Sequence, residues 1–167
     1  MTVKARIIMG IDPGFARTGF GVIKVSSNKM EAVDYGVIET MAGENFVDRL
    51  EYLYRELTKI IKKHKPEMVG VEELFFNTNV STALKVGQAR GVALLTIRQA
   101  KLPVFEYTPS QVKQAISCYG KADKKQVQQM IKLLLQLREI PKPDDAADAL
   151  AVAICTVNSY KLSQHYA

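Results

Sequence analysis

Four acidic residues fall at the ends of predicted elements, where their side chains could gather into one site. Asp12 closes the apolar run over residues 6–11, and Glu72 closes a second apolar run over residues 68–71. Asp145 and Asp148 open the last helix-like segment. Carboxylate oxygens favour hard cations such as magnesium or manganese over zinc. Two such ions about 3.5–4 Å apart are a standard device for hydrolysing phosphodiesters. The pattern therefore predicts a nuclease that depends on two metal ions.

The last two acids, Asp145 and Asp148, have two possible explanations, metal binding and helix capping. Asp145 and Asp148 are three residues apart, so on a helix they would share one face, with about 5–6 Å between their Cβ atoms. Acidic residues are also favoured at helix N-termini, where they bond to unpaired amides, and we expect Asp144 to be the N-cap. Two further acids on an otherwise apolar segment would repel each other unless a cation neutralised them. This favours a metal site.

The first two acids each leave an alternative open. Asp12 stands in an Asp-Pro-Gly triplet, which by itself indicates a turn. However, a carboxylate at the C-terminal end of a central apolar strand lies at the sheet edge where α/β proteins bind ligands. Glu72 is followed by Glu73, and adjacent strand residues point to opposite faces. Only one of the two can face the metal, and the residues alone do not choose between them.

Hydrophobic periodicity predicts the elements that would position these acids. Strands are expected at residues 6–12, 19–25 and 32–39, and the short turns between them make these strands antiparallel neighbours. The strand at 68–72 follows a helix and should run parallel to the first. A last strand is expected at 104–107, and helices at 44–63, 79–100, from Pro109, at 123–138 and from 144–145.

This order of elements indicates an α/β fold in one domain over residues 1–167. We expect a mixed five-stranded sheet with helices on both faces, and a poorly ordered tail from about residue 160.

The composition is that of a basic globular protein. The chain has 167 residues, 47% of them hydrophobic, and a net charge of +6, which mildly favours a polyanionic partner. No apolar stretch reaches the ~18 residues that a membrane span needs, and strand-like residues follow the N-terminus too soon for a signal peptide. Cys118 and Cys155 are too few and too far apart for a disulfide framework. We therefore expect a cytoplasmic protein, not bound to a membrane, whose thiols are inert in packing.

Aromatic and basic residues surround the predicted site. Phe75 and Phe76 follow the second acidic position directly. They are either core residues or exposed rings that stack on bases, a contact worth about 1–3 kcal/mol per base. Lys113, Lys121, Lys124 and Lys125 flank residues 118–120, either as a solvated face or as the border of a cleft. Arg17, which is expected in the loop after the first acid, is a further candidate for contact with a DNA backbone.

Five motifs in order resemble the RuvC family of bacterial Holliday junction resolvases, within the ribonuclease-H-like superfamily. The resemblance runs from about residue 6 to residue 156. Its motifs are Gly10-Ile11-Asp12-Pro13-Gly14 with Thr18-Gly19, Val71-Glu72-Glu73-Leu74-Phe75, Gly87-Gln88-Ala89-Arg90-Gly91, Gln111-Val112-Lys113-Gln114 and Asp145-Ala146-Ala147-Asp148-Ala149-Leu150.

The resemblance implies an enzyme that resolves four-way DNA junctions by paired symmetric nicks, in homologous recombination and DNA repair. Two magnesium ions, for which manganese can substitute, would be held by Asp12, Glu72, Asp145 and Asp148. The products would carry 5′-phosphates. A homodimer and the branch-migration proteins RuvA and RuvB are the implied partners.

The resemblance also implies roles for three residues outside the metal site. Phe75 aligns with a phenylalanine that engages bases at the junction centre, and we favour it over Phe76. Lys113 and Lys124 align with lysines that contact phosphate or stabilise charge near the active site. A lysine there can offset charge that builds up on the phosphoryl oxygens.

Small residues recur every four positions along helix 79–100, at Ala83, Gly87 and Gly91. Such residues allow another backbone to approach closely. They would pack either on the domain's own sheet or on a second subunit, and a two-fold dimer would match a two-fold junction.

Three other functions fit the sequence less well. A ribonuclease-H-like nuclease of the YqgF type, acting on RNA, is the nearest alternative, but the Phe75 loop and the lysine pair argue against it. A sugar-kinase or actin-like ATPase shares the start of the first motif but needs two such domains. A junction-binding protein without activity has no support, because all four acidic positions are filled.

Overall fold

The structure is a computed structural model that describes residues 5–27, 29–73, 80–117 and 123–165. Three strands come first: β1 (Arg6–Asp12), β2 (Arg17–Ser26) and β3 (Lys29–Glu39). The remaining elements are α1 (Phe46–His64), β4 (Met68–Glu72), α2 (Val80–Gln99), β5 (Val104–Tyr107), α3 (Pro109–Ser117), α4 (Lys124–Leu134) and α5 (Asp144–His165). In the described part of the chain, no helix is both long enough and apolar enough to cross a membrane.

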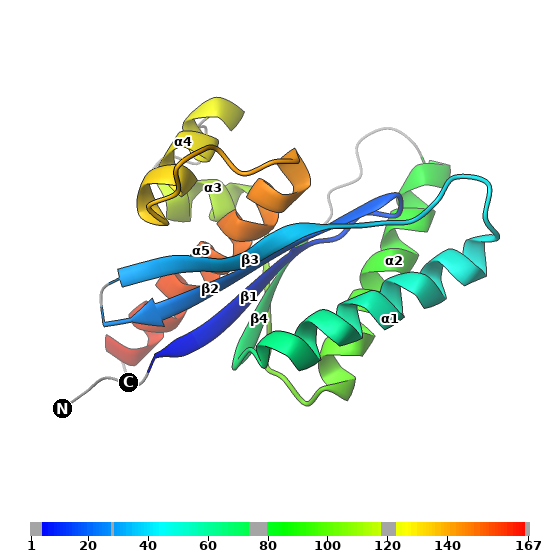
Figure 1. The fold of residues 1–167 in the computed structure, drawn as a ribbon, viewed down its shortest axis with the longest axis horizontal. Coiled ribbons are helices and arrows are strands. Elements are labelled where there is room, and N and C mark those ends of the chain that lie inside the picture. The colour runs from blue at the N-terminus through cyan, green and yellow to red at the C-terminus, as the bar shows by residue number, and fades with distance from the viewer. Residues whose placement is uncertain (1–4, 28, 74–79, 118–122, 166–167) are drawn as a thin grey trace.

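The five strands form one mixed sheet in the order β3-β2-β1-β4-β5. β1 and β2, and β2 and β3, are antiparallel, while β1 and β4, and β4 and β5, are parallel. Helices α1 and α2 cover one face, and α5 with α3 and α4 covers the other (Figure 1). The predicted architecture is therefore confirmed.

Alternating side chains of β1 build both halves of the core. Met9 and Ile11 are fully buried among Leu53 and Leu57 of α1 and their neighbours, whereas Ile8 is buried in the cluster on the side of α5. This two-sided burial follows from the period of two along a strand. It is also why the run that ends at Asp12 is almost continuously apolar, as expected for a central strand covered on both faces.

Helix α5 lies very close to the sheet because glycines face it. A Cβ atom built at Gly10 would overlap the backbone of Ala149 and Ala153, and one at Gly19 would overlap the carbonyl of Asp145. The first half of α5 is correspondingly rich in buried alanines. This close approach brings the start of α5 over the end of β1.

The boundaries of several elements differ from the prediction. β2 begins at Arg17 rather than residue 19, because Arg17 and Thr18 pair with Glu39 and Ile38 of β3. β3 begins at Lys29 and accommodates an irregularity in register opposite Val22 and Ile23. α4 ends at Leu134 rather than at residue 138. Gln136, two residues after this end, adopts a left-handed conformation with φ 53°. α5 extends to His165, and the expectation of a poorly ordered tail from about residue 160 stays a prediction.

The expectation that Asp144 caps the last helix is wrong. The helix begins at Asp144 itself, and the carbonyl of Pro143 accepts bonds from the amides of Ala146 (3.0 Å) and Ala147 (3.4 Å). The Asp144 carboxylate points to α4 instead, where it pairs with Lys124.

Candidate active site

The four predicted acids lie at one edge of the sheet. β1 and β4 are adjacent and parallel, with Ile11 beside Val71, so the next residue of each strand, Asp12 and Glu72, is also adjacent. These two side chains share a hydrogen bond. Glu72 therefore faces Asp12, which supports Glu72 over Glu73 as the metal-binding candidate.

Asp145 and Asp148 complete the cluster from α5, which packs on one face of the sheet. Both stand in the first turns of α5, which the glycines of β1 and β2 allow to approach the sheet. The charge of each raises the pKa of Asp12, and Asp148 raises that of Glu72. Acids from three separate elements thus act on one another across a small region.

Burial and the charge of neighbouring acids raise the pKa of three acids in this cluster, Asp12, Glu72 and Asp148. Burial is the main cause that raises the pKa of Asp12 to about 8, and the charges of Glu72, Asp148 and Asp145 add to it. Burial likewise raises the pKa of Glu72 and that of Asp148. The hydrogen bond between Asp12 and Glu72 favours the proton on Asp12. A cation at this place would favour the ionised carboxylates, because its positive charge would offset their mutual repulsion.

The donor set fits a hard divalent cation. It offers only carboxylate oxygens, which magnesium and manganese prefer. Among the described residues, no group of three or more histidine, cysteine, aspartate or glutamate side chains is placed so that it could hold a metal ion without rearrangement. An ion would therefore have to draw these carboxylates together, and it would relieve the repulsion that raises their pKa values.

Two of the predicted lysines border the cluster. Lys113 of α3 and Lys124 of α4 line a cavity of about 200 Å³ together with Glu72 and Asp148. The Nζ atom of Lys124 lies 3.6 Å from Asp148 Oδ2 and 3.0 Å from Asp144 Oδ2. The charge of Lys113 opposes the effects that raise the pKa of Glu72. A phosphate that reaches the carboxylates would thus meet two ammonium groups.

A wider open depression of about 750 Å³ adjoins the start of α5. It is lined by Arg17, Lys124 and Lys142, together with Pro143, Asp144 and Asp145. The Nε atom of Arg17 lies 2.6 Å from Glu39 Oε1, in an exposed ion pair. Lys142 was not predicted. The only signal for it was a basic residue directly before the Pro-Asp-Asp start of the last helix.

The remaining predicted residues do not join this site in the described part of the chain. Lys125 is exposed and lines neither of the two cavities beside the carboxylates. Phe75, Phe76, Lys121 and Cys118 lie outside the described residues. Cys155 is buried, which raises the pKa of its thiol to about 11, and the thiol donates a hydrogen bond to the carbonyl of Gln111 at 3.8 Å.

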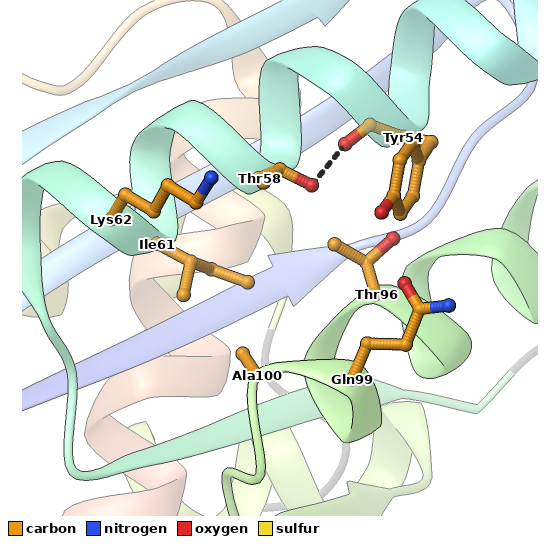
Figure 2. A pocket seen from close by; sticks show the side chains of 7 residues that line it. All are labelled: Tyr54, Thr58, Ile61, Lys62, Thr96, Gln99 and Ala100. Carbon is orange, nitrogen blue, oxygen red and sulfur yellow. Dashed lines mark hydrogen bonds between the residues drawn. The ribbon is translucent and has the colours of Figure 1, made fainter.

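A separate cavity of about 190 Å³ lies between α1 and α2. Figure 2 shows its lining, in which Thr58 donates a hydrogen bond to the carbonyl of Tyr54 and Thr96 projects from the opposite helix. The lining residues are Tyr54, Thr58, Ile61, Lys62, Thr96, Gln99 and Ala100. It contains no acid, and it shares no residue with the cavities beside the carboxylates.

Comparison with known proteins gives a consistent result over nearly the whole chain. The family model described as "Crossover junction endodeoxyribonuclease RuvC" matches residues 8–156. A protein of that name from Ruminiclostridium cellulolyticum is 57% identical over 156 residues, which is 93% of this chain and 94% of that protein. This chain belongs to the RuvC family.

Solved RuvC structures agree with the fold. The structure of Thermus thermophilus RuvC has a TM-score of 0.88 and 34% sequence identity, covering 94% of this chain and 96% of that one. T. thermophilus RuvC in complex with Holliday junction substrate has a TM-score of 0.85 and 33% identity, with the same coverage. The predicted ribonuclease-H-like fold is confirmed.

Proposed function

We propose that this protein is a structure-selective DNA endonuclease that resolves four-way junctions by symmetric paired nicks. The observation that carries the proposal is the cluster of Asp12, Glu72, Asp145 and Asp148, with two lysines at its border, in a chain of the RuvC family. Its role would be in homologous recombination and DNA repair. An RNA-directed nuclease of the YqgF type is not favoured, because the family match is to crossover junction endodeoxyribonucleases.

The four carboxylates would hold two magnesium ions, for which manganese could substitute. When bound, such ions lower the pKa of an attacking water and stabilise the departing 3′ oxygen, so that the product carries a 5′-phosphate. Asp12 and Glu72 would bind from the sheet edge, and Asp145 and Asp148 from α5. The raised pKa values of Asp12, Glu72 and Asp148 support this role, because their ionised forms are disfavoured by burial and by neighbouring negative charge, and a bound cation would offset both costs.

Lys113 and Lys124 would act on the substrate phosphate. Both line the cavity that Glu72 and Asp148 share. A fixed ammonium there stabilises the charge that spreads over the phosphoryl oxygens in the transition state. Lys113 belongs to α3 and Lys124 to α4, so two different helices would each contribute one ammonium group to bind the phosphate.

The DNA backbone would continue along the wider depression. Arg17 and Lys142 line it beside Lys124, and phosphate contacts of this kind contribute binding without reading sequence. Lys121 and Lys125 would add contacts nearby. Phe75, with Phe76 beside it, would stack on bases at the centre of the junction.

A homodimer through α2 is also part of the proposal. Apart from the neighbouring backbone of α2 itself, no described atom lies within 4 Å of a Cβ built at Gly87 or at Gly91, so in the described part of the chain neither glycine packs closely against the sheet. Leu84 and Leu95 are 65% and 56% exposed. With the two glycines they follow the i, i+3, i+7, i+11 spacing of one helical face. A second copy of this helix would cover that face and provide the second active site.

The proposed setting is the cytoplasm, with RuvA and RuvB as partners in branch migration. The support for it is membership of the RuvC family and the use of only two cysteines, one of which is buried.

The test is cleavage of a labelled synthetic four-way junction, with and without magnesium, beside linear duplex, single-stranded DNA and an RNA–DNA hybrid. We expect nicks on opposing strands of the junction alone, and only with metal. Cleavage of the hybrid or of RNA would contradict the proposal and leave a nuclease of another branch. Tight binding of the junction without cleavage would contradict the proposed role of the four carboxylates.

A further inference from the structure

Asp144 stands one position before the proposed metal-binding acids, but its side chain faces α4. Its Oδ2 atom lies 3.0 Å from Lys124 Nζ, and its Oδ1 atom accepts a hydrogen bond from Gln128 Nε2 at 2.9 Å. Lys124 and Gln128 are four residues apart, hence on one face of α4. Both oxygens of this one carboxylate are therefore used to hold two side chains of a neighbouring helix.

The backbone of α4 is itself firmly placed at this point. Asp123 is the N-cap of α4 and forms a capping box with Gln126. The backbone amide of Gln126 donates to Asp123 Oδ1 at 2.8 Å. Val127 and Ile131 anchor the same helix in the core. The start of the Lys124 side chain is thus fixed, and its four-carbon stem is the flexible part.

The ammonium of Lys124 lies between two carboxylates of different kinds. Asp144 is on the outside, with 61% of its side chain exposed, while Asp148 belongs to the cluster and is 36% exposed. The contact to Asp144 is the shorter, at 3.0 Å against 3.6 Å. Asp144 therefore holds the ammonium at the rim of the cluster, within reach of the cavity but not fully paired with Asp148.

We propose that Asp144, itself oriented by Gln128, is a positioning residue that sets the place of the Lys124 ammonium for cleavage. This inference rests on the proposed role of Lys124 in the reaction. Exposed ion pairs contribute little to stability, so the contact is expected to matter for rate rather than for folding. A group that must be ordered at each turnover lowers the rate, because its freedom is lost in the transition state.

The test is a double-mutant cycle in single-turnover cleavage of a preformed junction complex in magnesium. D144A is expected to lower the cleavage rate constant by about 10-fold, with junction affinity changed less than about twofold. In the K124A background, adding D144A should change the rate by less than about twofold, because residues that act through one another are not additive. D144E should recover part of the loss, and Q128A should show a smaller loss of the same kind.

Each other outcome overturns the inference. A D144A enzyme that cleaves at the parent rate would show that Lys124 needs no positioning. An equal loss in the K124A background would show that Asp144 acts on the carboxylate cluster instead. If K124A cleaved at the parent rate, Lys124 would have no role in cleavage and this inference would be wrong. The proposed function, cleavage of the junction, would not be contradicted by that result. Melting curves identify a misfolded variant, in which case D144N, which keeps the side-chain shape, replaces D144A in the cycle.

Discussion

The guanidinium of Arg49 lies 3.8 Å from the ring centroid of Phe15, a residue of the turn that follows Asp12. Arg49 Nε also donates to Thr40 Oγ1 at 3.0 Å, and Thr40 Oγ1 donates to the carbonyl of Phe15 at 2.8 Å. Phe15 also stacks on Phe46, with 4.9 Å between the two ring centroids. The first turn of the chain is thus tied to the end of β3 and the start of α1, which fixes the strand end that carries Asp12.

Arg49→Met is expected to destabilise the protein by about 1–3 kcal/mol, through the lost hydrogen bonds and the lost cation–π contact. Cleavage should fall as well, because the turn after Asp12 is no longer held. Urea unfolding measures the first effect, and single-turnover cleavage the second. Arg55→Met is the matched control: its guanidinium lies 5.5 Å from the Tyr52 ring on an exposed face. If Arg49→Met and Arg55→Met lost equal stability and equal activity, the contacts of Arg49 with Phe15 and Thr40 would have no special importance.

Asp12→Asn is expected to abolish cleavage, to leave junction binding nearly intact and to change how stability depends on pH. The folded protein keeps a proton on Asp12 up to about pH 8, whereas an unfolded carboxyl releases it near 3.8. Between these values unfolding releases a proton, so raising the pH lowers the stability of the metal-free protein. Stability is fully present at the acid end of this interval and is lost as the pH rises through the folded pKa.

The variant lacks this titrating group. At pH 8 in EDTA, Asp12→Asn should therefore be as stable as the parent or more stable, by about 1–3 kcal/mol. Saturating magnesium should reduce or reverse the difference, since a metal that binds only the folded parent stabilises it. Thermal melts at pH 5 and pH 8, with and without magnesium, make the comparison. A severe loss of stability at both pH values would argue against a repulsive acidic cluster.

The acids of the site could be predicted from the sequence because Asp12 and Glu72 each close an apolar run, while Asp145 and Asp148 open the last helix. Alternation and apolar runs identified β1 and β4, and their parallel order followed from the helix between them. The contacts of Arg49 and Asp144 could not be found in this way. Arg49 fits the polar face of a surface helix, and an acid at a helix start is most simply explained as a cap. Only the packing of α1 and α4 against segments distant in the sequence gives these side chains their partners.

Lys142→Ala is expected to weaken junction binding and to reduce its salt dependence. If Lys142 neutralises one phosphate along the depression it shares with Arg17 and Lys124, the slope of log K against log salt should become shallower by about 0.9. Fluorescence anisotropy over a range of salt concentrations measures this slope. Lys62→Ala removes the same charge beside the cavity between α1 and α2 and should leave the slope unchanged. Identical slopes for Lys142→Ala and the parent would place the DNA elsewhere.

Gly87→Ala is expected to have opposite effects on folding and on dimerisation. Glycine in a helix interior is about 1 kcal/mol less favourable than alanine, and apart from the neighbouring backbone of α2 itself no described atom lies within 4 Å of the added methyl group. A single subunit should therefore become more stable. In the proposed dimer, however, the same methyl group would meet the partner helix and hold the two backbones apart.

Analytical ultracentrifugation over a range of concentrations should accordingly show weaker dimerisation for Gly87→Ala, while urea unfolding of the monomer shows a gain of up to about 1 kcal/mol. Lys101→Gly serves as the control away from this face, because Lys101 has a left-handed conformation with φ 59° that suits glycine. That variant should leave the dimer intact. If Gly87→Ala gained stability and dimerised as tightly as the parent, the face formed by Leu84, Gly87, Gly91 and Leu95 would not be where two subunits meet.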